Sequence, residues 1–128
     1  MNFLLDTHAF LWWVNDAPEL STNANAYLAE PRNEVFFSLA SVWEMAIKLS
    51  IGKLKLAEPL ENFVIEQLQR NGFRQLGISF QHVIGVASLP FHHRDPFDRL
   101  IIAQALAERL PVLTADRTFD AYGIQRLW

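Results

Sequence analysis

The sequence contains no cysteine among its 128 residues. This absence excludes a disulfide framework and any metal site built on thiolates. A metal ion bound by this chain must therefore be held by oxygen or imidazole ligands. Nothing in the composition points to secretion.

Long hydrophobic runs are also missing, although 51% of the residues are hydrophobic. No stretch approaches the roughly 18 to 20 apolar residues needed to span a bilayer. The opening MNFLLDTHAF reaches an aspartate too early for a secretory signal peptide. We expect a cytoplasmic protein without membrane association, and a single domain across residues 1–128.

Basic residues are few, with 11 Lys and Arg against 14 Asp and Glu and a net charge of -3. Nucleic-acid-binding domains usually carry an excess of basic residues, so this balance counts against such a function. An acidic charge balance and nucleic-acid binding are compatible if the acids gather at one site, where a divalent metal ion offsets their charge.

Short apolar runs alternate with helical patterns along the chain. Strands are expected at NFLL, EVFFS, FRQLGI and LPVLT, and the segments between them predict helices. Strands that alternate with helices indicate an α/β protein with a mainly parallel sheet. We therefore predict a three-layer α/β/α sandwich.

Two predicted helix starts carry acids. Ser41 and Glu44 have the spacing of a capping box, which places Glu44 in the first turn of its helix. Pro96 suits the first position of a later helix with Asp95 as its N-cap. Asp98 then lies in the first turn of that helix.

Four carboxylates are candidates for a metal centre: Asp6, Glu44, Asp98 and Asp116. Asp6 and Asp116 each follow a short buried strand, and parallel sheets bind ligands at the carboxyl ends of their strands. Oxygen ligands suit Mg²⁺ or Mn²⁺, and such ions support phosphodiester hydrolysis. Two carboxylates about 5 Å apart repel by about 3 kcal/mol at an effective dielectric of 20, so four together are costly without a cation.

Each of these acids also has a purely structural explanation. Asp6 suits a helix N-cap, and Glu44 suits a capping box or an ion pair with Lys48. The helix dipole favours an acid at Asp98, and Asp116 suits the start of a turn. The four acids are more informative together than singly.

Four segments resemble the PIN-domain family, particularly the VapC-type toxins of bacterial toxin–antitoxin pairs. They are LLDTHAFLWW, SVWEMAIK, HHRDPFDRLIIAQA and LTADRTF, and they span almost the whole chain in family order. The resemblance implies a PIN-like fold and assigns the metal-site acids to Asp6, Glu44, Asp98 and Asp116. It makes Thr7 a support for Asp6, and Asp95 a cap that can add outer-shell hydrogen bonds.

The resemblance also implies an activity and partners. It implies an endoribonuclease that depends on Mg²⁺ or Mn²⁺, cuts structured RNAs such as tRNA or rRNA, and leaves 5′-phosphate and 3′-hydroxyl ends. It further implies a homodimer and a small antitoxin protein whose C-terminal segment covers the active-site groove.

Several residues near the acids have two interpretations. His92 and His93 suggest zinc ligands, but loop histidines are more often solvated or act as caps. Arg94, Arg99 and Arg117 are candidates to hold RNA phosphates, and pairing with nearby carboxylates is an equal alternative.

The tryptophans are a further group with two interpretations. Each lies beside apolar residues, which favours burial in the core or in a dimer interface over stacking on bases. They are Trp12, Trp13, Trp43 and Trp128.

Three competing functions also place acids on a sheet of this kind. A receiver domain needs paired acids after its first strand and a lysine after a late strand, and LLDTH and LTADRT do not fit. A haloacid-dehalogenase-type phosphatase needs an aspartate where this chain has His8. A catalytically inactive PIN-like scaffold that only binds partners stays open, and metal-dependent activity distinguishes it from a nuclease.

Overall fold

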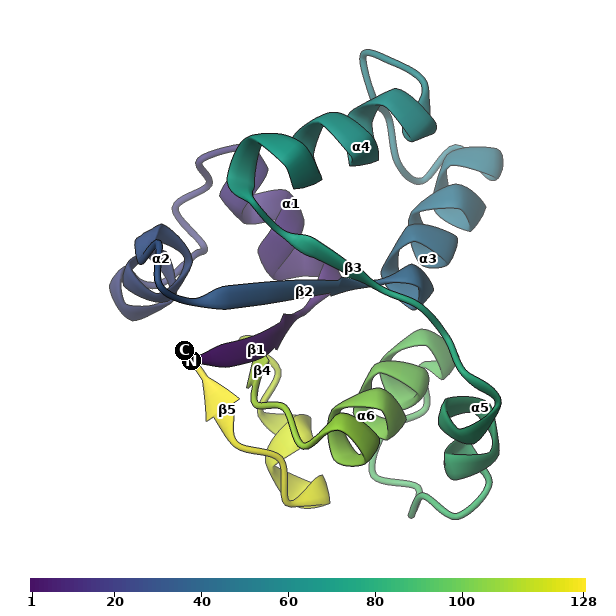
Figure 1. Cartoon of the computed structure of the whole chain (residues 1–128). Coiled ribbons are helices and arrows are strands. Elements are labelled where there is room, and N and C mark those ends of the chain that lie inside the picture. The colour runs from purple at the N-terminus through teal and green to yellow at the C-terminus, as the bar shows by residue number, and fades with distance from the viewer.

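A five-stranded sheet organises the protein, seen here in a computed structural model that describes all residues 1–128 (Figure 1). The strands are β1 (Asn2–Leu5), β2 (Glu34–Ser38), β3 (Arg74–Leu76), β4 (Val112–Leu113) and β5 (Arg126–Leu127). Their order is β3-β2-β1-β4-β5, and every neighbouring pair is parallel. The predicted parallel sheet is confirmed. The prediction lacks β5, because a two-residue strand carries too little pattern to be recognised.

Helices cover both faces of this sheet (Figure 1). One layer holds α1 (Thr7–Val14), α2 (Thr22–Ala29), α3 (Leu39–Ser50) and α4 (Leu60–Asn71). The other holds α5 (Phe80–Val86), α6 (Pro96–Glu108) and the 3₁₀ helix η1 (Arg117–Tyr122). The predicted three-layer α/β/α sandwich is therefore confirmed. None of these helices has the length and apolar character required to cross a membrane.

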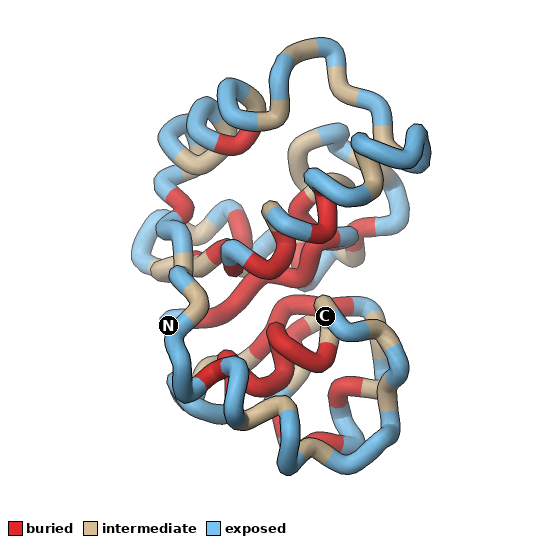
Figure 2. The backbone as a smooth tube through the Cα atoms, turned by 90° about the vertical axis from the view of Figure 1, so that its right-hand side faces the viewer, coloured by how far each residue is buried: buried red, intermediate tan, exposed pale blue.

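Alternate residues of β1 feed two separate hydrophobic clusters. Phe3 and Leu5 belong to the cluster under α1 to α4, and Leu4 belongs to the cluster under α6 and η1. In the first cluster Phe10 stacks on Phe37, with ring centroids 4.1 Å apart. Figure 2 shows the buried backbone concentrated in the middle of the molecule, between the exposed outer turns of the helices. Burial on both faces explains why the strands read as continuous apolar runs.

The start of α3 differs from the prediction. Ser38 is the N-cap, and its Oγ accepts a hydrogen bond of 2.9 Å from the Ala40 N–H. The helix thus follows β2 directly, and Glu44 lies in its second turn. The predicted capping box of Ser41 and Glu44 is wrong, because the hydroxyl at the end of the strand caps the helix first. Ser41 is instead buried within the helix.

The start of α6 agrees with the prediction. Pro96 is the first helical residue, and the Asp95 carboxylate accepts hydrogen bonds from the N–H groups of Phe97 at 2.8 Å and Asp98 at 3.1 Å. Asp95 is therefore the predicted N-cap, and Asp98 lies in the first turn.

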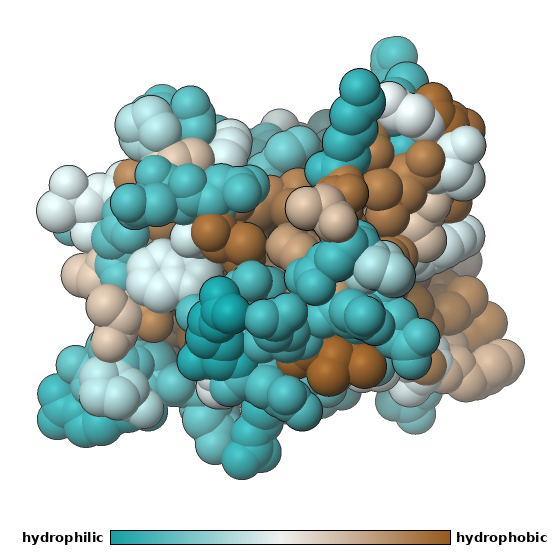
Figure 3. All heavy atoms as spheres, turned by 90° about the horizontal axis from the view of Figure 1, so that it is seen from above, coloured by the Kyte–Doolittle hydropathy of each residue, from teal (hydrophilic) through white to brown (hydrophobic).

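One part of the surface is rich in apolar side chains. The exposed large residues of α3 and α4 include Trp43, Ile47 and Ile65. A hollow of about 330 Å³ opens between these helices, next to Val42 and Leu60. Figure 3, viewed from the side of α4, shows apolar side chains reaching the surface among polar ones. This apolar α3–α4 face is unpaired in the single chain.

Replacing Phe10 with alanine tests the described core. Phe10→Ala removes a fully buried ring and leaves a cavity, so we expect the free energy of unfolding to fall by about 3–5 kcal/mol. Phe80→Ala is the matched control, because the Phe80 side chain is 80% exposed, and it should change stability by less than about 0.5 kcal/mol. Urea unfolding followed by circular dichroism measures both. Similar losses in the two variants would contradict this core.

Candidate active site

Asp6 lies between the end of β1 and the start of α1. Its carboxylate accepts hydrogen bonds from the His8 N–H at 2.6 Å and from the Thr114 hydroxyl at 2.5 Å. Burial raises the pKa of Asp6 above its ordinary value, and the Thr114 hydrogen bond only partly opposes this. Asp6 therefore caps α1 and also presents a buried carboxylate at the carboxyl end of a central strand. Its structural and chemical explanations are compatible.

Glu44 is a buried acid with a charged partner. Its side chain projects from α3 and is 5% exposed, and the Lys48 Nζ lies 2.7 Å from its Oε2. The predicted ion pair across one helical turn is confirmed. This ammonium offsets part of the charge that Glu44 brings to the interior.

Asp98 is a second acid whose pKa is raised. Burial is the main cause, and the negative charges of Asp6, Asp95 and Glu44 add to it, raising the pKa of Asp98 to about 7. Such charges act strongly only at short range, because water and salt screen distant ones. The charges of Asp6 and Glu44 therefore act on the first turn of α6.

Asp116 follows β4 and caps η1, where it accepts a hydrogen bond of 3.0 Å from the Thr118 N–H. The His93 Nε2 lies 2.8 Å from its Oδ2 and 3.2 Å from the Oδ2 of Asp98. One ligand atom from each of these three side chains lies within 4.8 Å of the other two. Burial alone would raise the pKa of Asp116, but hydrogen bonds from Thr118 and His93 lower it below its ordinary value.

The topology brings the four acids to one edge of the sheet, although Asp6 and Glu44 lie outside the tight group of His93, Asp98 and Asp116. Parallel strands end at the same edge of a sheet, and each following helix starts there. Asp6 follows β1, Glu44 lies on the helix after β2, and Asp116 follows β4. Asp98 joins them because α6 runs back from this carboxyl edge to the start of β4 (Figure 1).

The hydroxyl that supports Asp6 differs from the expected one. The Thr7 Oγ1 donates to the Ser41 Oγ at 2.7 Å and so joins α1 to α3, away from the Asp6 carboxylate. Thr114 donates to Asp6 instead. Sequence reasoning missed Thr114, although a hydroxyl two residues before Asp116 at a strand end was a usable signal.

Arg99 supports the loop before α6. Its guanidinium donates hydrogen bonds of 3.0–3.4 Å to four main-chain carbonyls, those of Val86, Leu89, Pro90 and His93. It also lies 4.1 Å from the centroid of the Phe91 ring. The side chain is buried in these contacts, which favours the supporting role over contact with RNA. Arg94 and Arg117 are exposed beside the acids.

The tryptophans divide into two groups. Trp12, Trp13 and Trp128 are partly buried against the first hydrophobic cluster, as expected. Trp43 is 52% exposed and packs edge-on against Phe97, with centroids 4.8 Å apart. Trp43 therefore lies outside the core, on the outer side of α3, and its burial in a dimer interface stays a prediction.

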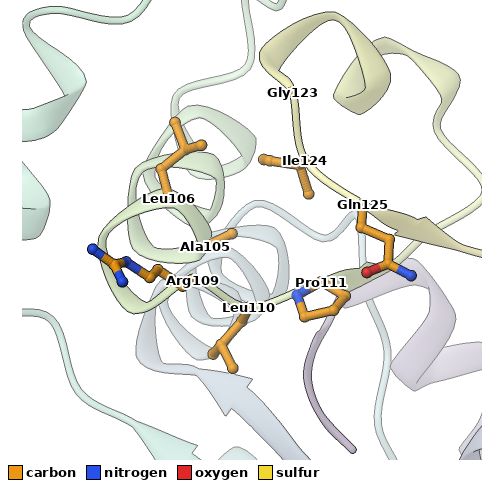
Figure 4. Close-up of a pocket in the computed structure, with 8 residues that line it drawn as sticks. All are labelled: Ala105, Leu106, Arg109, Leu110, Pro111, Gly123, Ile124 and Gln125. Carbon is orange, nitrogen blue, oxygen red and sulfur yellow. The ribbon is translucent and has the colours of Figure 1, made fainter.

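A separate hollow lies at the opposite edge of the sheet (Figure 4). It measures about 270 Å³, and its lining includes Pro111 and Gln125, which directly precede β4 and β5. Arg109 is its one charged residue. Without acids or other paired reactive groups, this hollow offers no catalytic chemistry. The carboxyl edge is therefore the candidate active site.

Comparison with known proteins agrees with this geometry. A family model described as the PIN domain matches residues 3–125. The chain belongs to the PIN-domain family. Ribonuclease VapC22 from Mycobacterium tuberculosis is 30% identical over 120 residues, which cover 93% of this PIN domain chain and 90% of that protein. Ribonuclease VapC16 from the same organism is 33% identical over 69 residues, covering 51% of this chain and about half, 49%, of that protein. Within the family this PIN domain is of the VapC type.

A solved structure supports the fold of this PIN domain. The crystal structure of VapBC2 from Rickettsia felis, bound to a DNA fragment from its promoter, matches with a TM-score of 0.72. The match covers 100% of both chains at 19% sequence identity. At this identity the likeness concerns the fold alone.

The raised pKa of Asp98 predicts how the stability of the metal-free PIN domain depends on pH. An unfolded aspartate has a pKa of about 3.9, so between about pH 4 and pH 7 the folded state holds more protons than the unfolded state. The free energy of unfolding should therefore fall as pH rises through this window. In Asp98→Asn the free energy of unfolding should fall less steeply with pH. The dependence that remains is due to Asp6, whose pKa is also raised.

Urea unfolding in EDTA at several pH values measures this dependence. Glu19→Gln, at an exposed carboxylate outside the cluster, is the control and should keep the wild-type slope. An Asp98→Asn protein with an unchanged slope would show that Asp98 does not titrate as described.

Proposed function

We propose that this PIN domain is an endoribonuclease that depends on Mg²⁺ or Mn²⁺ and is the toxin of a type II toxin–antitoxin pair. The observation that carries the proposal is the group of Asp98, Asp116 and His93 at the carboxyl edge of the sheet, and the charges of Asp6 and Glu44 act on Asp98 there. The relatives VapC22 and VapC16 are named ribonucleases, which supports the reaction class. We further propose that the whole chain acts as one PIN domain in the cytoplasm.

The chemistry of the donor set fits a hard divalent cation. All four proposed ligands are carboxylates, and oxygen ligands are those that Mg²⁺ and Mn²⁺ prefer. The raised pKa values of Asp6 and Asp98 show that negative charge is disfavoured there when no cation is present. A divalent cation would favour the ionised forms of both groups.

The protein's own residues would orient these ligands. Thr114 donates a hydrogen bond to one carboxylate oxygen of Asp6, and the Lys48 ammonium pairs with Glu44. Asp95 fixes the first turn of α6 and with it the direction of Asp98. When bound, the divalent ion would supply activation of water and stabilisation of charge on the phosphodiester. No side-chain nucleophile is then required, and we propose 5′-phosphate and 3′-hydroxyl product ends on tRNA or rRNA.

The proposal includes protein partners. The apolar α3–α4 face and its hollow of about 330 Å³ support contact with another polypeptide, because monomers rarely leave large apolar patches uncovered. The structural neighbour from Rickettsia felis is a VapBC2 assembly, which supports a cognate antitoxin for this chain. We also propose a homodimer, as the resemblance implies.

Cleavage of purified tRNA and rRNA tests the function. Antitoxin-free wild type should cut one of them with Mg²⁺ or Mn²⁺ and stop with EDTA. Asp6→Asn should lose activity by about 100-fold or more, because removing one electrostatic group at a reacting centre commonly costs that much. Glu19→Gln, prepared identically, is the control and should cut like wild type.

Two outcomes would count against this function. Equal cleavage by Asp6→Asn and wild type would identify a contaminating nuclease. Folded wild type that cuts neither RNA under any metal condition would favour the inactive binding scaffold.

A further inference from the structure

His93 lies among the proposed metal ligands although it is outside the set of four acids. Its side chain is 16% exposed, and its Nε2 is 2.8 Å from Asp116 Oδ2 and 3.2 Å from Asp98 Oδ2. A histidine in this place has two chemical roles open to it. It can donate a hydrogen bond to the acids through an N–H, or it can bind a metal through a nitrogen lone pair.

The other ring nitrogen decides between these roles. The main-chain N–H of Asp95 donates to the His93 Nδ1 at 3.2 Å. Since this N–H can only donate, Nδ1 must be an acceptor without a proton. In the neutral ring the proton then sits on Nε2, which faces the two carboxylates. A nitrogen that carries a proton has no lone pair free for a metal ion.

The ring is held in this orientation by its surroundings. The main-chain N–H of His93 donates to the Tyr122 hydroxyl oxygen at 2.8 Å, and that hydroxyl donates to the Pro90 carbonyl at 2.9 Å. The ring also packs edge-on against Phe119, with centroids 6.0 Å apart. The imidazole is thus placed by the loop, by η1 and by the Asp95 main chain.

We propose that His93 is a positioning residue, which donates its Nε2–H to the carboxylates of Asp116 and Asp98 and holds them close enough to share one divalent ion. This proposal rests on the proposed metal-dependent function. Asp116 needs such a constraint, because its side chain is 35% exposed and lies at the start of a short 3₁₀ helix. Two carboxylates brought this close repel each other, and a donor placed between them offsets that repulsion.

Binding of Mn²⁺ to antitoxin-free protein, measured by electron paramagnetic resonance, tests the proposal without any RNA. His93→Ala should bind Mn²⁺ about 10 to 100 times more weakly, the usual effect of losing a group that orients a metal ligand. His93→Gln should recover part of the affinity, because its amide N–H can reach the same carboxylates. His92→Ala is the matched control and should bind like wild type, because the exposed His92 side chain faces Tyr122 and makes no hydrogen bond to the acids.

The spin-echo spectrum of the same Mn²⁺ samples separates positioning from ligation. A histidine bound directly to Mn²⁺ gives a ¹⁴N modulation in the spin-echo spectrum. We expect wild type and His93→Gln to show the same spectrum, without a histidine modulation that the substitution removes. A modulation present in wild type and lost in His93→Gln would overturn the proposal and make His93 a ligand. Because this comparison uses His93→Gln, it holds even if His93→Ala fails to fold.

The affinities also separate this proposal from the proposed function. If wild type binds Mn²⁺ and His93→Ala and His93→Gln bind it equally well, the positioning role is overturned and the metal site stands. If wild type binds no Mn²⁺, the metal-dependent function itself is overturned, and the role of His93 falls with it.

Discussion

Mutual repulsion among buried carboxylates is the constraint on which the carboxyl edge of this sheet depends. Parallel pairing of β1, β2 and β4 ends three strands at one edge, and the residues that follow them are acids or lead to one. Asp98 shows the effect of this constraint, because burial and the charges of its neighbours raise its pKa to about 7. A structure of this kind persists only if other interactions offset the cost.

The fold supplies these interactions locally. Asp6 and Asp116 each accept main-chain hydrogen bonds as helix caps, so both are tied to secondary structure as well as to the site. Lys48 neutralises part of the charge on Glu44, and Thr114 donates to Asp6. What these groups leave uncompensated is the charge that a divalent cation would balance. Stability and proposed chemistry therefore depend on the same few contacts.

Much of this arrangement was predictable from the sequence, for physical reasons. Apolar runs such as NFLL and EVFFS indicate strands buried on both faces, and Asp95-Pro96 marks a helix start that gave the position of Asp98. Local signals of this kind are strong because they depend on neighbouring residues alone. The start of α3 was misplaced because Ser38, at the end of β2, caps the helix three residues before Ser41.

The remaining features depend on contacts between distant parts of the chain. Thr114, after β4, reaches Asp6 after the neighbouring strand β1, and His93 reaches Asp116 from a separate loop. The Thr114 hydroxyl at a strand end was a usable signal, but the sequence does not show which acid either side chain reaches. The most direct test of the proposed centre is anomalous diffraction at the manganese edge from crystals grown with Mn²⁺. We predict a peak close to the carboxylate oxygens of Asp6, Glu44, Asp98 and Asp116, and crystals with no peak at this carboxyl edge would contradict the account.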